Sequence, residues 1–251
     1  MDWLDQTVLF TIALAANMLS AFAGGGAGLV QLPALIFLGL PFGTALATHK
    51  VASVALGIGA TLRNLRERTL EWPLALIMAG SGVPGAILGA SLVLNIPDRV
   101  AEIALGLLTI SLGLYSWRKP QLGQHHQPRH RDPGGYVLGG AVLFGIGVLN
   151  GSLTSGTGLF VTLWLVRWFG LDYRRAVGFT LVLVGLFWNA SGAITLGVLG
   201  DIRWSWLPAL LAGSLLGGYL GAHLAIVQGS RLIKRVYELV TVAVGLKLIL
   251  G

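Results

Sequence analysis

The sequence predicts an all-α protein that crosses a membrane several times, and three observations carry that prediction. The 251 residues are 55% hydrophobic and 11% charged, with a mean hydropathy of +0.78, whereas about a quarter of the residues of a soluble domain are charged. Apolar stretches long enough to cross a hydrocarbon core of roughly 30 Å recur along the chain. They do not alternate with a period of two, which indicates helices and not barrel strands.

Six apolar stretches form two groups of three, and a glycine-rich segment precedes each group. The stretches are Ala45–Leu62, Leu74–Leu94, Val100–Trp117, Ala176–Leu199, Leu207–Val227 and Leu232–Leu250. The first glycine-rich segment is "GGGAG" at Gly24–Gly28, and the second is "NGSLTSGTG" at Asn150–Gly158. Each segment interrupts an apolar run, where glycine weakens a helix.

The two halves resemble each other when the chain is shifted on itself by about 130 residues. "AGLVQLPALIFLGL" (Ala27–Leu40) falls on "TGLFVTLWLVRWFGL" (Thr157–Leu171), and "GAILGA" (Gly85–Ala90) falls on "GGYLGA" (Gly217–Ala222). The polar stretch Arg118–Gly135 between them is rich in proline and glycine, as linkers are. We therefore predict a first repeat over residues 1–117, a linker over 118–135 and a second repeat over 136–251.

Loop charge indicates that the repeats are inverted relative to each other. "PDRVAE" (Pro97–Glu102) is acidic on balance, whereas its repeat partner "GSRLIK" (Gly229–Lys234) is basic. Because lysine and arginine concentrate in cytoplasmic loops, we expect equivalent loops on opposite faces, with the linker inside and both termini outside. The same bias explains the net charge of +7 without nucleic acid as a partner.

An inverted pair with three crossings per half requires the preceding segment to return to its own side. Leu4–Ala23 and Ala27–Leu40 are therefore predicted to be the two arms of a re-entrant hairpin, with "GGGAG" as its turn. The second half is expected to hold an equivalent hairpin. The predicted fold is two inverted repeats, each a re-entrant helical hairpin plus three transmembrane helices, or about eight membrane segments if the hairpins are counted.

The two hairpin turns are candidate anion-binding elements. Each turn starts a new helix, whose first backbone N–H groups lack intrahelical partners and whose dipole is positive at that end. Two such starts near the midplane would attract an anion without a fixed charge. The alternative for "GGGAG" is close helix packing through small residues. The candidate residues are Gly24, Gly25, Gly26, Gly28, Asn150, Ser152, Thr154, Ser155, Gly156, Thr157 and Gly158.

Polar residues inside a span are costly and point to function. "ATHK" places Thr48, His49 and Lys50 in the first long span. Lys50 is a candidate anion ligand, and His49 is a candidate hydrogen-bond partner or proton carrier. The alternative for Lys50 is that it extends to the outer interface. Thr180 and Asn189 lie in the corresponding helix of the second half.

Other polar residues have structural explanations. Glu238 follows Lys234 by four residues, which predicts an ion pair within one helix, so no deep carboxylate is left for a proton relay. "HHQPRH" (His125–His130) is interpreted as a solvated part of the linker without an ordered scaffold, and not as a metal site. Small residues in "SGVPGAILGAS" (Ser81–Ser91) are interpreted as packing contacts. We expect no metal, no cofactor and no catalytic site.

The stretch "AGGGAGLVQLPALIFLGLPFGTALATHK", continued by "LRNLRERTLEW", resembles the sulfite exporter TauE/SafE family, also called the TSUP transporters. The likeness extends over nearly the whole chain. Members commonly have Asn or Ser where this chain has His49. The resemblance implies a secondary transporter in the cytoplasmic membrane of a prokaryote that moves sulfite, sulfonates such as sulfoacetate, or related sulfur-containing or small organic anions.

The expected mechanism is alternating access between the two halves around a midplane site. An anion is driven outward by the inside-negative potential, which favours export. An anion channel of the same fold and a proton-coupled importer of an organic anion stay open as alternatives. The direction, the coupling ion, and the choice between a monomer and a homodimer are also open. A membrane enzyme is disfavoured because the sequence lacks a cluster of His, Asp or Glu in the spans.

Overall fold

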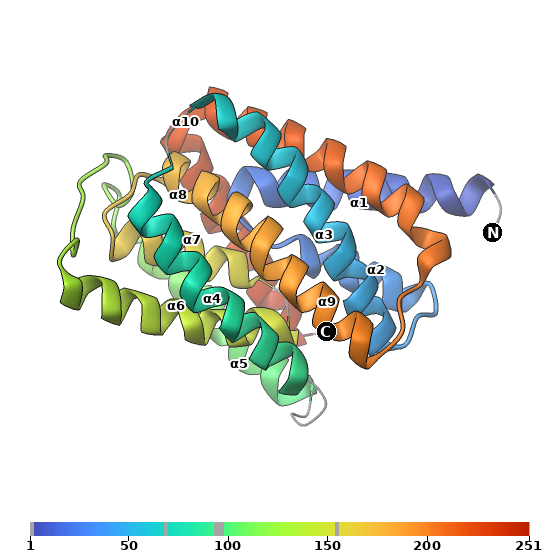
Figure 1. Ribbon diagram of the computed structural model, residues 1–251. Coiled ribbons are helices and arrows are strands. Elements are labelled where there is room, and N and C mark those ends of the chain that lie inside the picture. The colour runs from blue at the N-terminus through green and yellow to red at the C-terminus, as the bar shows by residue number, and fades with distance from the viewer. Residues whose placement is uncertain (1–2, 68–69, 93–97, 154–155, 251) are drawn as a thin grey trace.

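The computed structural model describes residues 3–67, 70–92, 98–153 and 156–250, and in these ranges all regular secondary structure is helical (Figure 1). Six of the helical stretches are long and apolar enough to cross a membrane. The predicted all-α class is therefore confirmed for the described part of the chain.

The helices over Trp3–Ala23 and Pro133–Leu153 lead into the two glycine-rich segments, and the other long helices fall where the six apolar stretches predict them. The long helices are α1 (Trp3–Ala23), α3 (Phe42–Asn64), α4 (Trp72–Leu92), α5 (Asp98–Trp117), α6 (Pro133–Leu153) and α10 (Leu207–Leu250), together with the continuous helix α8–η4–α9 over Tyr173–Leu199. Helix α10 contains two of the predicted stretches. Its backbone leaves the helical region at Gly229, with φ 76° and ψ 174°, so the two stretches lie on either side of a kink.

The first glycine-rich segment breaks the chain between α1 and a short second arm. Gly24, Gly25 and Gly26 have φ values of 87°, 146° and 104°, a region that residues with a Cβ rarely adopt. A 3-10 turn, η1 (Ala27–Leu29), and the seven-residue helix α2 (Gln31–Phe37) follow. The prediction of one helix over Ala27–Leu40 was therefore wrong in its extent.

The short second arm ends in a Schellman motif, which explains its length. The N–H of Gly39 bonds the carbonyl of Ile36 at 2.8 Å, and the N–H of Leu40 bonds the carbonyl of Leu35 at 3.2 Å. Gly39 has a φ of 95°, the left-handed conformation that this cap requires. The helix therefore stops at a glycine that the sequence displays.

The second glycine-rich segment separates α6 from helix α7 (Thr157–Arg167). Gly156 caps α7 with a φ of 73°. Thr154 and Ser155, two of the predicted site residues, lie outside the described residues.

Helices α3 and α8–η4–α9 pack side by side in the centre of the molecule (Figure 1). The latter consists of α8 (Tyr173–Phe179), the π-helical segment η4 (Thr180–Trp188) and α9 (Asn189–Leu199). A Cβ added to Gly57 of α3 would lie 2.4 Å from the carbonyl carbon of Gly185 in η4. The backbones of the two helices therefore touch at a position where each helix has a glycine.

Small residues also form the contacts between the outer helices, which pack in pairs. Gly217 of α10 packs on the carbonyl of Leu14 in α1, and Gly89 of α4 packs on the carbonyl of Val148 in α6. After the Gly229 kink, α10 packs on α5, where Gly113 contacts Thr241. The interpretation of the small residues of Ser81–Ser91 as packing contacts is confirmed by these neighbours.

The linker lies against the connection between α7 and α8. The His130 ring stacks on Trp168 with centroids 3.9 Å apart, and the backbone N–H of Gln127 bonds the carbonyl of Gly170 at 2.8 Å. The prediction that "HHQPRH" lacks an ordered scaffold was therefore wrong, because these partners come from a distant part of the sequence. No group of three His, Asp or Glu residues suited to a metal occurs among the described residues.

Candidate functional site

The two glycine-rich segments meet each other. A Cβ added to Gly25 would lie 2.6 Å from the backbone of Gly158. Thr162 of α7 donates a hydrogen bond from its hydroxyl to the carbonyl of Gly24 at 2.8 Å. Because no side chain separates the two backbones, they approach more closely than residues with a Cβ would allow. The contact joins parts of the chain that are far apart in the sequence.

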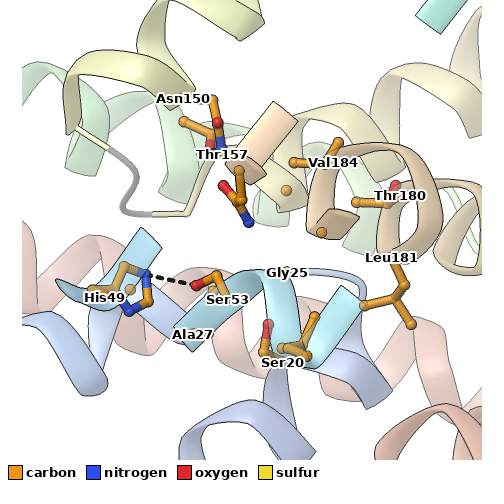
Figure 2. A pocket seen from close by; sticks show the side chains of 16 residues that line it. Ser20, Gly25, Ala27, His49, Ser53, Asn150, Thr157, Thr180, Leu181 and Val184 are labelled. Carbon is orange, nitrogen blue, oxygen red and sulfur yellow. Dashed lines mark hydrogen bonds between the residues drawn. The ribbon is translucent and has the colours of Figure 1, made fainter. Parts of the chain in front are cut away.

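A cavity of about 40 Å³ lies where these two segments meet α3 and the α8–η4–α9 helix (Figure 2). The predicted residues that line it are Gly25, Gly26, Gly28, His49, Asn150, Thr157, Gly158, Thr180 and Asn189. A space of this size holds only a few water molecules. A larger ligand therefore requires the lining elements to move apart.

Lys50 lies beside the cavity and is fully buried. Its Nζ donates to the backbone carbonyl of Asn150 at 2.6 Å, to Oδ1 of Asn150 at 2.9 Å and to Oδ1 of Asn189 at 3.2 Å. Three acceptors match the three protons of an ammonium group. The alternative that Lys50 extends to the outer interface was wrong, because its amine has partners inside the molecule.

The partners of Lys50 are all neutral. Among the described residues, no carboxylate forms an ion pair with it. A buried charge without a counter-charge costs several kcal/mol, which an anion in the neighbouring cavity would reduce. The aliphatic part of the Lys50 side chain is held by α9, since a Cβ on Gly192 would lie 3.3 Å from its Cδ.

Lys50 also determines which way two amide side chains point. Since an ammonium group only donates, Asn150 and Asn189 must turn their oxygens toward it, and their NH₂ groups then point elsewhere. The NH₂ of Asn150 donates to Oγ1 of Thr157 at 2.9 Å. Both asparagines line the cavity. The lysine therefore fixes the orientation of both amide groups, and Thr157 accepts from one of them.

His49 lines the same cavity from α3. Its Nε2 lies 3.2 Å from Oγ of Ser53, one helical turn further along (Figure 2). The ring is almost completely buried, and its Nδ1 has no hydrogen-bond partner among the described residues. Since a charged imidazolium donates from both nitrogens, this arrangement fits a neutral ring.

Comparison with known proteins assigns the chain to a family. The family model for the sulfite exporter TauE/SafE matches residues 9–248. The chain belongs to the TauE/SafE family. No solved structure matches it.

Relatives of this TauE/SafE chain are named as transporters. The probable membrane transporter protein YfcA of Escherichia coli K12 is 28% identical over 244 residues, which cover 96% of this chain and 88% of the relative. A probable membrane transporter protein of Haemophilus influenzae is 30% identical over 90% of this chain and 88% of its own length. ORF9 of a Sinorhizobium species, also named a probable membrane transporter protein, is 30% identical over 96% and 91%.

Several predicted residues of the TauE/SafE chain lie outside the cavity. Thr48 bonds the carbonyl of Thr44 at 2.6 Å and accepts from the N–H of Arg203 at 3.0 Å, so it holds the loop before α10. Ser152 bonds the carbonyl of Val148 on its own helix. Gly24 and Gly156 shape the two breaks without lining the cavity.

Other lining residues were not predicted. They are Ser20, Ala27, Ser53, Leu56, Leu181, Val184 and Gly185. Ser53 stands four residues after His49, a spacing that puts both on one helix face and could have revealed it. Leu181, Val184 and Gly185 of η4 gave no such signal, because they lie in a run of apolar residues and glycine between Thr180 and Asn189.

Proposed function

We propose that this TauE/SafE membrane transporter moves sulfite, sulfonates or related small organic anions outward across the cytoplasmic membrane by alternating access. The observation that carries the proposal is the buried ammonium of Lys50, which lies next to the central cavity and, among the described residues, bonds neutral oxygens. The family name supports the sulfur-containing class of substrate.

The proposed substrate site is the cavity between the two glycine-rich segments. Asn150 and Asn189 line this cavity and bond the Lys50 ammonium behind it, so the positive charge lies close to the substrate. His49 and Ser53 add hydrogen-bonding groups from α3. The start of α7 at Thr157 adds a positive helix end. These groups come from both halves of the chain, so movement of one half against the other would open and close the site.

We further propose that the two halves are inverted repeats. The packing supports this relation, because each helix that precedes a glycine-rich break packs on the other half: α1 on α10, and α6 on α4. The helices that come next after the short arms α2 and α7, which are α3 and α8–η4–α9, pack on each other, and so do α5 and the last part of α10. Such reciprocal pairs are expected from a twofold relation between halves.

The proposed direction follows from charge. An anion leaving the cell gains about 2.3 kcal/mol per charge per 100 mV of inside-negative potential. Export therefore needs no coupled ion, whereas import would need cations to move with the anion.

Transport by reconstituted protein tests the proposal. Purified protein in liposomes should take up labelled sulfite, and unlabelled sulfite on the opposite side should accelerate that uptake. We expect Lys50→Met, which keeps an unbranched side chain of most of the length and removes its charge, to reduce uptake by at least about tenfold. Lys119→Met, at an exposed linker residue, is the matched control and should retain uptake.

Each alternative gives a different result in the same assay. Uptake without acceleration by trans substrate, together with an ionic current, would replace the carrier with an anion channel. Uptake that needs an inward proton gradient would replace export with proton-coupled import. Equal uptake by folded Lys50→Met and by wild type would contradict the proposed site.

A further inference from the structure

We propose that the central cavity selects anions that carry a single negative charge and a short apolar group, and discriminates against dianions. The inference rests on the proposed function, which it narrows toward monoanionic sulfonates. By charge alone, it also favours hydrogensulfite over the sulfite dianion. It follows from the number of charges around the cavity and from the distribution of polar and apolar side chains on its wall.

One formal positive charge lies beside the cavity among the described residues. Lys50 contributes it through Asn150 and Asn189. Among the described residues that line the cavity, His49 is the one titratable side chain, and its Nδ1 without an acceptor fits the neutral ring. The described lining residues of α1, of both glycine-rich segments and of η4 are neutral.

A helix end adds only part of a second charge. The start of α7 at Thr157 corresponds to about half an elementary charge. Together with Lys50, this is enough for a monoanion and insufficient for a dianion. A dianion in the cavity would therefore keep negative charge that none of the described lining residues compensates, and burial makes such charge costly.

Most of the polar side chains lie at one end of the cavity, although Ser20 and Thr180 also line it. His49, Ser53, Asn150 and Thr157 lie on one side in Figure 2, whereas Leu181 and Val184 lie on the other. Leu56 also lines the space. The hydroxyl of Thr180 is paired with that of Thr162 at 2.9 Å, so part of its hydrogen-bonding capacity is already used.

This arrangement fits a molecule with two different ends. A charged head can lie beside Asn150 and Asn189, and a methyl or ethyl group can contact the aliphatic wall formed by Leu56, Leu181 and Val184. An oxyanion without an alkyl group would place an oxygen against that aliphatic wall, where it has no hydrogen-bond donor. Methanesulfonate has such a shape. Sulfate has a similar tetrahedral head, carries a second charge and lacks the methyl group.

Binding of matched anions to the purified full-length protein tests the inference. Calorimetry would compare methanesulfonate, hydroxymethanesulfonate and sulfate. We expect sulfate to bind at least about tenfold more weakly than methanesulfonate. Hydroxymethanesulfonate has the same charge and a polar tail, so it should lie between them.

A pH series with sulfite separates charge from shape. Sulfite loses its second proton near neutral pH, whereas methanesulfonate stays a monoanion. The apparent affinity for sulfite should therefore fall between about pH 6 and about pH 8, while that for methanesulfonate stays constant. Constant methanesulfonate affinity also shows that the protein's own groups do not cause the change.

Variants of the aliphatic wall test the second half of the inference. Val184→Thr keeps the shape of the side chain, adds a hydroxyl to the wall and should reduce the preference for methanesulfonate over hydroxymethanesulfonate. Val182→Thr is the matched control, because Val182 lies in the same segment, is buried and does not line the cavity. Its anion preference should be that of wild type.

The outcomes distinguish the inference from the proposed function. Sulfate binding as tightly as methanesulfonate would overturn the inference and leave an anion transporter standing. Equal preferences in folded Val184→Thr and wild type would overturn the role of the aliphatic wall. Failure of every anion to bind folded wild-type protein would overturn the proposed function itself.

Discussion

Single atoms at the two glycine-rich segments decide how closely the halves approach. Gly25 combines a φ of 146° with a neighbour so close that an added Cβ would lie 2.6 Å from Gly158. A side chain at Gly25 would therefore suffer both backbone strain and a steric clash with Gly158. Backbone atoms cannot rotate away as a side chain can, so the contact tolerates no added carbon.

Substitution of Gly25 should therefore be severe. We expect Gly25→Ala to lose substrate binding and to lower the melting temperature of the detergent-solubilised protein. Gly39→Ala is the control, since Gly39 also has a positive φ, 95°, but an added Cβ there has no atom within 4 Å. It should cost only the backbone strain, about 1 kcal/mol. Equal effects of the two variants would show that the close contact does not matter.

The Thr162 hydroxyl fixes the first glycine-rich segment to α7. It donates to the carbonyl of Gly24 and contacts the hydroxyl of Thr180. Thr162→Val should lower the stability by on the order of 1 kcal/mol, because it leaves a buried carbonyl without a donor. Thr11→Val, which removes a hydroxyl bonded within its own helix, should change the melting temperature less. Thermal unfolding of both variants would measure the difference.

At the scale of elements, the linker makes a pH-dependent contribution to the stability of the fold. Burial, followed by the positive charge of Arg175, lowers the pKa of His126, which lies 3.7 Å from Glu71. A histidine whose pKa is lowered on folding binds protons more readily in the unfolded chain. It therefore destabilises the fold as pH falls below its ordinary value of about 6.5.

Removal of that histidine should reduce the acid sensitivity. We expect the melting temperature of His126→Gln to fall less than that of wild type between about pH 7 and about pH 5. His125→Gln, at an exposed neighbour, serves as the control and should follow wild type. Parallel curves for His126→Gln and wild type would contradict the assignment.

The elements and the site differ in how far sequence predicts them. The long helices follow from hydropathy alone, and His49, Lys50, Asn150 and Asn189 stood out as polar residues in apolar surroundings. Their arrangement did not follow, because Lys50 and Asn189 are 139 residues apart and only the fold brings them together. The π-helical turn of η4 was missed because an apolar run with one glycine shows no change of period.

At the scale of the whole molecule, an ionic cluster joins the two halves at one end. Glu67, in the connection after α3, pairs with Arg63 at 3.0 Å and with Arg174 at the start of α8 at 2.8 Å. Arg63 also donates to His223 of α10 at 3.0 Å. One carboxylate thus links both halves of the chain.

Neutralising that carboxylate should loosen this end. Glu67→Gln is expected to lower the melting temperature by a few degrees at low ionic strength, and the difference from wild type should shrink at high salt because partly exposed pairs are screened. Asp201→Asn, at an exposed loop residue, should have little effect at either salt concentration. A salt-independent difference would point to packing in place of charge.

The contact between the two glycine-rich segments also limits how such a transporter can diversify. Where backbone meets backbone, there is no side chain to exchange, so a new substrate preference cannot arise at Gly25 or Gly158 without loss of the junction. Variation must instead enter through the side chains around it, above all His49, Ser53 and Val184. Directed evolution toward a different cargo should accordingly begin with libraries at those three positions and leave the glycines untouched.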